Sequence, residues 1–330
     1  MEVDDGAELC FPQLLNTSCR KPTLPRSEAV FLNTLLSSIS LLTVALNLLV
    51  IISVSHFRQL HTPTNILLLS LAVSDLIVGL LLMPLVILRI TTSCWFLGDG
   101  VCSLFMYVSY IIPCASVGEM VLISVDRYVA ICHPLHYTTR ITARRVKLCV
   151  CLCWFCSVFY SSLFVKYGVT QPGRYNSCYG ECVVLVDHIA EAADLALTFV
   201  VPVSLIIVLY MRVFVVAVSQ ARAMRSHITA VTLQSSVTLT TKKSELKAAR
   251  TLGVLVVVFL ICFFPYYGVT LAEDSLLSTY FLTFAIYLFY FNSCLNPVIY
   301  AMFYPWYRKS VKLIVTLQIL QSGSCETNIL

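Results

Sequence analysis

Seven long apolar stretches alternate with polar connectors along this chain. They lie at residues 30–54, 65–88, 101–125, 146–165, 192–218, 252–271 and 280–303. Each is close to the ~20 residues that a helix needs to cross the hydrocarbon core of a bilayer. None shows the period-two alternation of an outer-membrane strand, and lipid accepts only backbones whose polar groups are paired internally. The pattern predicts an all-α membrane protein, a seven-transmembrane helix bundle.

The composition agrees with a membrane protein. Of the 330 residues, 58% are hydrophobic and 12% are charged, which is more apolar surface than a soluble fold of this length can hide. We expect an extracellular tail at residues 1–28, the bundle at 29–303 and a cytoplasmic part at 304–330. The last part begins "YPWYRKSVKLIV", where bases alternate with apolar residues as in a short amphipathic helix at the membrane interface.

Positive charges gather on one side of the predicted membrane. With the N-terminus outside, 16 of the 22 Lys and Arg fall on the cytoplasmic side, as the positive-inside rule requires. The outer side has twelve acids against six bases, a net charge of −6. Such a field favours cationic ligands, although a solvated loop surface accounts for most of these acids equally well.

The N-terminal segment and the cysteines fit an extracellular face. The start, "MEVDDGAELC", lacks the apolar core of a signal peptide, so we expect an uncleaved tail, with a glycosylation acceptor at Asn16 in "NTS". Six cysteines lie on the outer side, where oxidation is possible, and six cysteines allow 15 pairings. They are Cys10, Cys19, Cys94, Cys102, Cys178 and Cys182.

Several polar side chains fall inside the apolar stretches, where ionisable groups are rare and usually functional. Asp75, in "LAVSDL", is the acid of the second stretch. Side chains that could join it occur in stretches one, three and seven: Asn47, Ser116, Asn292, Ser293 and Asn296. An oxygen-rich pocket around one carboxylate can hold a small hard cation such as sodium. A hydrogen-bonded network that merely packs the helices accounts for these residues equally well.

The inner end of the third stretch reads "DRY", Asp126 to Tyr128. Arg127 can snorkel to the interface, or it can pair with Glu245, the only acid in a basic segment before stretch six. Such a pair would hold two helix ends together, and breaking it would open the inner face. Five stretches also contain a proline, which removes a backbone hydrogen bond and can kink a helix: Pro84, Pro113, Pro202, Pro265 and Pro297.

As a set, these motifs resemble those of rhodopsin-like G-protein-coupled receptors. "LAVSDL", "WFLG" before Cys102, "DRYVAICHPLHY", "FLICFFP" and "NPVIY" follow in the family's order over roughly residues 29–320. The ending "NSCLNPVIYAMFYPWY" narrows the resemblance to trace amine-associated receptors, with Tyr307 where that family usually has Phe. The resemblance implies a multi-pass plasma-membrane receptor, not an enzyme.

The family resemblance also implies partners and a switch. The ligand is a small extracellular amine, such as an amine odorant, and the inner partner is a cyclic-AMP-raising G protein of the olfactory type. The switch residues are Asp126, Arg127, Tyr128, Glu245, Asn296, Pro297 and Tyr300. Two disulfides are implied, Cys102–Cys182 and Cys19–Cys178, which leaves Cys10 and Cys94 paired or free.

One departure from the family pattern concerns the amine site. Most such receptors hold the ammonium with an aspartate seven residues after the cysteine that corresponds to Cys102, and here that position is Ser109. Asp194 lies eight residues before Pro202, about 12 Å toward the outer face at ~1.5 Å per residue. A subset of fish trace amine receptors is similar in carrying its amine-binding acid there. We interpret Asp194 as the relocated counter-ion, against the alternative that it faces outer water or pairs with a loop base.

An ammonium ligand would relieve the cost of that carboxylate. A charge costs about 2.5–3.5 kcal/mol at the membrane centre and less toward the surface, and the ligand would turn it into a charge-assisted hydrogen bond. By the family pattern, Tyr110, Phe263, Tyr266, Tyr267 and Tyr290 line the pocket, where each ring contributes about 0.5–2 kcal/mol to cation binding. Phe263 stands where the family carries the Trp that moves on activation.

Two further acids were considered for binding or structural roles. Glu273 could meet the second charge of a diamine, although an acid at a helix end is usually solvated. Glu119 lies nearer the inner side and is expected to hydrogen-bond Trp154 and Ser70 between helices.

Three other classes of protein were weighed. A receptor for a non-amine ligand would keep Asp194 incidentally. A transporter would show two similar halves or paired broken helices, and neither is visible in the sequence. An enzyme is disfavoured because the chain has no GxSxG, HExxH or Gly-rich phosphate loop.

Overall fold

A computed structural model describes residues 9–14, 16–19, 26–92, 94–169, 178–182, 188–228, 253–269, 279–321 and 323–329. Within these ranges the protein is helical, and the only β-pairing is an isolated bridge between Ser18 and Tyr179. Two of the predicted site residues, Glu245 and Glu273, lie outside the described residues.

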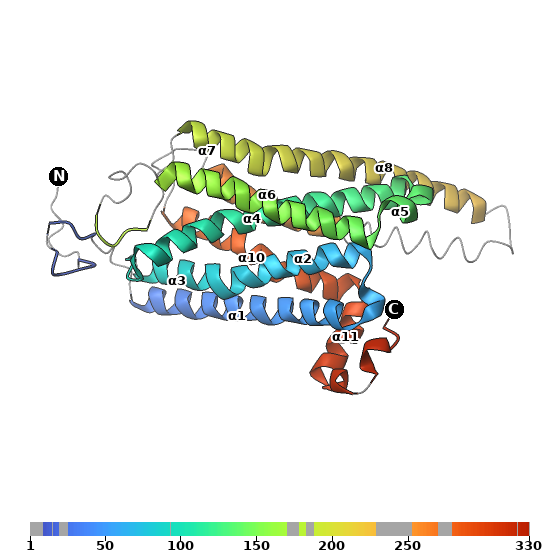
Figure 1. The fold of residues 1–330 in the computed structure, drawn as a ribbon, viewed down its shortest axis with the longest axis horizontal. Helices are drawn as coiled ribbons and strands as arrows, with labels where there is room; N and C mark the ends of the chain where they lie inside the picture. Colours follow the sequence, from blue (N-terminus) through green and yellow to red (C-terminus); the bar gives the residue numbers. More distant parts are fainter. Residues whose placement is uncertain are drawn as a thin grey trace.

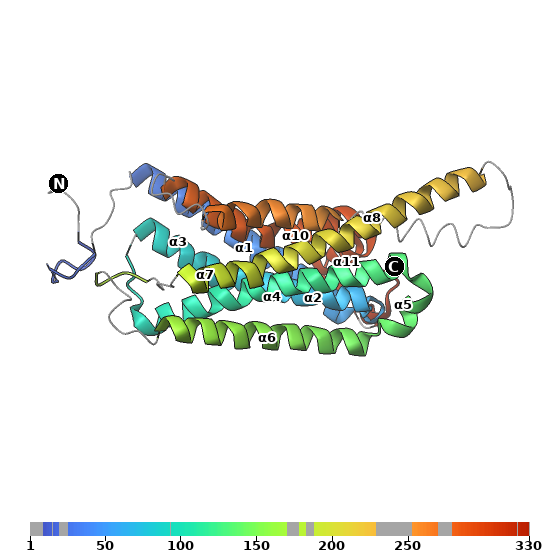
Figure 2. The same cartoon turned by 90° about the horizontal axis from the view of Figure 1, so that it is seen from above.

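Seven apolar helices form an elongated bundle (Figures 1 and 2). Six are long enough to cross a membrane: α1 (Arg26–His56), α2 (Pro63–Ile77) continued by α3 (Met83–Thr92), α4 (Gly98–Cys132), α6 (Ala143–Val169), α7 (His188–Leu195) continued by α8 (Val201–Ile228), and α10 (Thr279–Phe303). The shorter helix Gly253–Val269 completes the set. Each helix coincides with one predicted apolar stretch, so the all-α seven-helix prediction is confirmed.

Two of the five intrahelical prolines follow a π-helical turn. Val78–Leu82 joins α2 to α3 just before Pro84, and Ala196–Val200 joins α7 to α8 just before Pro202. Proline has no N–H to donate to the carbonyl four residues earlier, and a wider turn relieves the clash of its ring with that carbonyl. Each π turn changes the direction in which the preceding residues face, and one of those residues is Asp194.

Short elements close the end of the bundle that carries α5 (Pro134–Arg140) and α11 (Pro305–Val315) (Figure 1). Single 3₁₀ turns lie at Arg58–Leu60, Gln318–Leu320 and Ser324–Glu326. Trp306 and Tyr307 of α11 are buried, and the Tyr307 hydroxyl donates to the Leu46 carbonyl of α1 at 3.3 Å. The Tyr at position 307 therefore ties α11 to α1 with a hydrogen bond that the usual Phe could not make.

Close helix packing is visible where α4 meets α6. A Cβ atom added to Gly118 would lie 2.5 Å from the Cys153 sulfur, so a larger residue at position 118 would require the Cys153 side chain to move. Small residues of this kind let helix backbones approach closely in a membrane, where packing rather than water exclusion drives association.

Candidate functional site: a charged pocket at the disulfide-bonded end

A cavity of about 530 Å³ opens among the helices near the disulfide-bonded segment 9–19. Its walls come from α3, α4, α6, α7, the helix Gly253–Val269 and α10, with loop residues 180–182 above. Six of the predicted ligand-binding residues line it: Ser109, Tyr110, Asp194, Tyr266, Tyr267 and Tyr290. These six residues come from four different helices, which thus meet in one place.

Asp194 ends up half-buried in the cavity wall, near the end of α7. The Tyr160 hydroxyl of α6 donates to its Oδ1 at 2.8 Å, and the Thr198 hydroxyl donates to its backbone carbonyl at 2.7 Å. Among the described residues, no Lys or Arg forms a salt bridge with Asp194. The carboxylate is therefore oriented by a neutral donor, and its charge is left for another cation.

Ser109 lies on α4, in the same cavity. Its hydroxyl is buried beside the Tyr290 side chain of α10 and makes no hydrogen bond of good geometry within the described part of the chain. A buried hydroxyl without a partner costs about 1–3 kcal/mol. This wall therefore offers a neutral hydroxyl at the position where the family resemblance leads us to expect an acid.

Phe263 was expected in the cavity wall and lies one layer below it. It is 3% exposed and absent from the lining, and its ring packs on Phe259 and on Phe289 at centroid distances of 4.1 and 4.3 Å. Phe289 does line the cavity and separates Phe263 from it. A ligand can thus reach Phe263 through Phe289 rather than by direct contact.

The lining residues that the sequence did not predict include two charged side chains, Arg89 and Glu181, and the tyrosine Tyr160. Arg89 and Glu181 had been counted only as outer charges, and Tyr160 had no role. Arg89 sits at the end of a helix after a proline, and Glu181 directly precedes a disulfide cysteine. Adjacency to Cys182 was the one available signal, because that bond holds the loop over the bundle.

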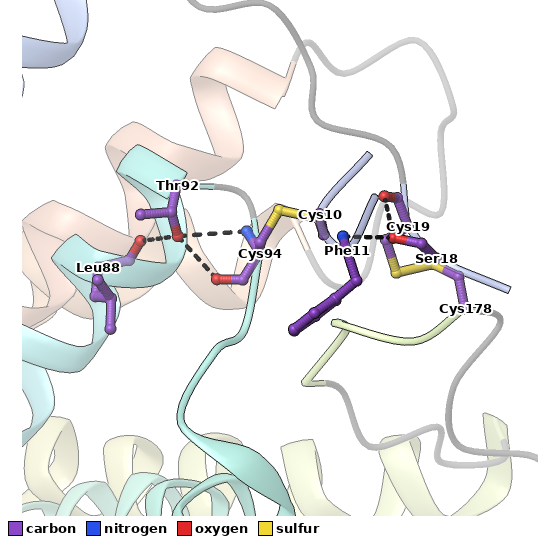
Figure 3. Close-up of a disulfide and its surroundings, with 8 residues drawn as sticks. All are labelled: Cys10, Phe11, Ser18, Cys19, Leu88, Thr92, Cys94 and Cys178. Atoms are coloured by element: carbon purple, nitrogen blue, oxygen red, sulfur yellow. Dashed lines mark hydrogen bonds between the residues drawn. A yellow bond between two sulfur atoms is a disulfide. The ribbon is translucent and has the colours of Figure 1, made fainter. Parts of the chain in front are cut away.

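Three disulfides hold the outer loops over this cavity. They join Cys102 to Cys182, Cys19 to Cys178 and Cys10 to Cys94. The first two are the pairs that the family resemblance implies, and the third resolves the two cysteines left over. Figure 3 shows Cys10–Cys94 beside Cys19–Cys178, so that one short tail segment is bonded both to the connector after α3 and to the loop after α6.

Backbone contacts complete this disulfide-bonded cap. The Cys10 amide donates to the Cys19 carbonyl at 2.8 Å, and the Cys19 amide donates to Tyr179 at 3.0 Å. Gly180 has φ +103°, where a side chain is strained, and an added Cβ would lie 3.0 Å from the Phe11 ring. Cys94 and Gly180 line the cavity, so the tail is bonded to one residue of the cavity wall and lies against another. Asn16 lies exposed on this segment.

Deeper in the bundle, the predicted sodium-site residues are all buried. Asp75 is 1% exposed and accepts a hydrogen bond from Asn296 Nδ2 at 2.8 Å. Ser116, Asn292 and Ser293 are also buried, and the side-chain oxygens of Asn292 and Asn47 have no hydrogen-bond partner within the described ranges. Two buried amide oxygens of the predicted cluster therefore remain without a donor in the described part of the chain.

A second buried acid bonds between helices. Ser70 donates to Glu119, Ser74 donates to its other oxygen at 3.4 Å, and the Trp154 indole donates to Ser70 at 3.0 Å. Glu119 thus bonds Ser70 as expected, while Trp154 reaches the acid's network through Ser70. This chain of bonds ties α2, α4 and α6 together.

At the opposite end of the bundle, Arg127 of α4 turns inward. It is 9% exposed and bonds to its neighbour Asp126 and to Thr64 of α2. Asp126 also accepts from Thr64 at 2.9 Å and from the Tyr137 hydroxyl of α5 at 2.8 Å. Arg127 is therefore held by a buried network. Of the other predicted switch residues, Tyr128 is half-buried, Pro297 lies inside α10 and Tyr300 is buried, and none of the three is hydrogen-bonded to Arg127 in the described part of the chain.

Comparisons with known proteins agree with this architecture. The family profile "7 transmembrane receptor (rhodopsin family)" matches residues 46–300. Trace amine-associated receptor 13c of Danio rerio is 37% identical, with 98% of this chain and 97% of the relative aligned. Trace amine-associated receptor 7e of Rattus norvegicus is 36% identical over 98% of this chain and 92% of its own, and receptor 8a of the same species is 37% identical over 96% and 95%.

These similarities extend over almost the whole chain and do not stop at the helices. The matched proteins are receptors rather than enzymes, in keeping with a sequence that lacks hydrolase and phosphate-binding motifs. Such receptors cross the plasma membrane several times, as the seven apolar helices require. The chain therefore belongs to the rhodopsin family of seven-transmembrane receptors and, within it, to the trace amine-associated receptors.

Proposed function

We propose that this receptor binds small extracellular amines and that the ligand's ammonium pairs with Asp194 instead of with an acid on α4. The names of its relatives refer to trace amines, which supports the ligand class. The observation that carries the proposal is the Asp194 carboxylate, which lines a cavity of about 530 Å³ and is bonded only by the neutral Tyr160 hydroxyl among described side chains.

The surroundings of Asp194 suit a cation. Tyr110, Tyr266 and Tyr267 line the same cavity, and the tyrosine ring faces attract positive charge. An ammonium at hydrogen-bond distance from a carboxylate gains a charge-assisted bond, worth a net ~1.5–3 kcal/mol. Ser109 can accept or donate a hydrogen bond but offers no counter-charge, so Asp194 is the acid on the helical walls that can supply one.

Ligand binding would change the conformation of the opposite end of the bundle, where Arg127 lies. In this proposal the N-terminus is extracellular, a glycan is attached at Asn16, and α11 lies along the cytoplasmic membrane surface. Agonist binding releases Arg127 from Asp126 and Thr64, so that Arg127 can engage a cyclic-AMP-raising G protein of the olfactory type. The charge and hydrogen-bond partners of Arg127 make it a two-state element that a helix movement can switch.

The deep polar cluster is the second proposed site. A sodium ion there would be held by Asp75 with Ser116 and Asn292, whose oxygens face the same buried region in this proposal. The unpartnered Asn292 oxygen supports a ligand for a hard cation, since a buried acceptor without a donor is costly. Asn296 and Ser293 would complete the site around the carboxylate.

The test of the amine site is an Asp194→Asn receptor in cells with a cyclic-AMP reporter, screened with linear alkylamines and arylethylamines. The amide keeps the size and the Tyr160 hydrogen bond but removes the charge. We expect the concentration for half-maximal response to rise about 10- to 150-fold at unchanged surface expression.

Glu191→Gln is the matched control, because Glu191 is an exposed acid one turn earlier on α7 and does not line the cavity. It should leave amine potency unchanged. Amine responses of equal potency in wild type and Asp194→Asn would refute the proposed ion pair.

A further inference from the structure

The cavity contains one base that the amine proposal does not use. Arg89 lies in α3 and lines the cavity together with the two acids Asp194 and Glu181. Arg89 is half-buried, and its guanidinium makes no hydrogen bond or salt bridge to any residue that the structure describes. A guanidinium carries five N–H donors, so the acceptors for these donors have to come from water or from a bound molecule.

Hydroxyl groups share the cavity with this base. Arg89 interacts electrostatically with Tyr290 and Tyr266, and the buried Ser109 hydroxyl lies beside Tyr290. A planar guanidinium beside several hydroxyl donors is the chemistry that recognises a carboxylate, because the fork of N–H groups matches two carboxylate oxygens. This corner of the cavity, formed by α3, α4 and α10, is therefore suited to an anionic group.

The two charged residues come from different helices. Arg89 belongs to α3 and Asp194 to α7, and the electrostatic partners of Arg89 are Tyr290, Glu181 and Tyr266 rather than Asp194. Both residues nevertheless line the one cavity. A ligand that spans it meets a carboxylate at one end and a guanidinium at the other.

We propose that the receptor recognises zwitterions, namely linear ω-amino acids whose ammonium pairs with Asp194 and whose carboxylate pairs with Arg89. This inference rests on the proposed role of Asp194. It also gives a reason for Ser109: an acid at that position would repel the ligand's carboxylate and compete for Arg89, whereas a serine hydroxyl can donate to it.

Glu181 is the competing explanation for Arg89. It lies in the loop above the cavity and interacts electrostatically with Arg89, without a salt bridge between the two. Its charge lowers the cost of a buried guanidinium in the unliganded receptor. If Glu181 served as a second ammonium site, the receptor would instead prefer diamines, and the two alternatives call for opposite charge at the far end of the ligand.

The experiment compares three ligands of one chain length: pentylamine, 5-aminopentanoic acid and 1,5-diaminopentane, with shorter and longer homologues of each. Potency is measured by cyclic AMP in cells expressing wild type, Arg89→Gln, Arg89→Lys, Glu181→Gln and Asp194→Asn, each normalised to surface expression. Binding to purified receptor in nanodiscs, measured as ligand-induced thermal stabilisation, provides a readout that does not depend on coupling.

We expect the ω-amino acid of best-fitting length to be about tenfold or more potent than the matching alkylamine in wild type. Arg89→Gln should remove that preference while changing alkylamine potency less than about threefold, and Arg89→Lys should keep part of it because it retains the charge without the fork. Glu181→Gln should leave the preference in place.

Several outcomes overturn the inference and leave the amine site standing. Wild type that responds to alkylamines but to no ω-amino acid is one, and an unchanged preference in Arg89→Gln is another. A preference for diamines that Glu181→Gln abolishes would assign the second corner to Glu181. Responses to all three ligands that survive in Asp194→Asn would instead refute the proposed function itself.

Discussion

The Cys10–Cys94 bond allows a quantitative prediction about the extracellular cap. The two cysteines are separated by 84 residues in sequence, but the other two disulfides shorten the path between them. The chain runs from Cys10 to Cys19, crosses to Cys178, continues to Cys182, crosses to Cys102 and returns to Cys94. The bond therefore closes a ring of only about 24 residues, by the counting used for loop entropy.

The ring size sets the expected effect of Cys10→Ser combined with Cys94→Ser. The chain-entropy relation gives about 3.5 kcal/mol for a 24-residue ring, against about 4.5 kcal/mol for the full sequence separation. A free energy of 3.5 kcal/mol corresponds to about two to three orders of magnitude in the equilibrium between docked and open tail. Substituting both cysteines together avoids leaving a free thiol that could exchange with its neighbours.

The assay is amide hydrogen exchange, read by mass spectrometry on peptides that cover residues 9–19. The Cys10 and Phe11 amides are bonded in the docked tail, to Cys19 O and Ser18 Oγ, both at 2.8 Å. Their exchange should accelerate by about 100-fold or more in the double variant. Cys325→Ser, which removes a free cysteine at the other end of the bundle, should leave their exchange unchanged.

A second pair of substitutions checks the ring argument itself. Cys19→Ser with Cys178→Ser opens the same ring at another bond, so the loss of protection should be similar in size. An acceleration of less than about tenfold in both double variants would show that hydrogen bonds and packing, not ring closure, hold the tail. The entropic reasoning would then be wrong for this cap.

Three further predictions concern the bundle. Tyr160→Phe removes the hydroxyl that donates to Asp194, so amine potency should fall about three- to tenfold in the cyclic-AMP assay. An unchanged potency would show that the carboxylate needs no orienting hydrogen bond. Ser70→Ala deprives the Trp154 indole of its acceptor at 3.0 Å and should lower the free energy of unfolding by about 1–3 kcal/mol. The measurement is the melting temperature in detergent, and Ser162→Ala, on an exposed part of α6, is the control. Asp75→Asn should make agonist potency insensitive to replacing sodium by N-methylglucamine, and a retained sodium effect would place the ion elsewhere.

The sequence by itself determined the seven helices and their order. Lipid requires every backbone polar group to be paired within its own helix, so each apolar stretch of sufficient length specifies an element without reference to its neighbours. The same local logic identified Asp194 as an unusual charge within an apolar stretch and Arg127 as a base at the inner end of the third one. Family motifs, rather than spacing, supplied two of the three disulfides.

The tertiary structure alone decided which side chains share the cavity. Arg89 and Glu181 looked like ordinary outer charges, Tyr160 had no role, and Phe263 was expected one layer higher than it lies. Such contacts depend on helix rotation and on where loops are bonded. The π-helical turn Ala196–Val200 changes how Asp194 faces, and the bond to Cys102 places Glu181 above the bundle.

The pairing of Cys10 with Cys94 is likewise decided by the tertiary structure and not by the local sequence. Among 15 pairings of six outer cysteines, no local feature favours this one, because pairing depends on distances between segments far apart in sequence. Only the docked tail, which Cys19–Cys178 also holds, brings the sulfurs of Cys10 and Cys94 together (Figure 3). Local sequence specifies helices because their hydrogen bonds are local, whereas the pocket and its cap arise from long-range packing that no single stretch encodes.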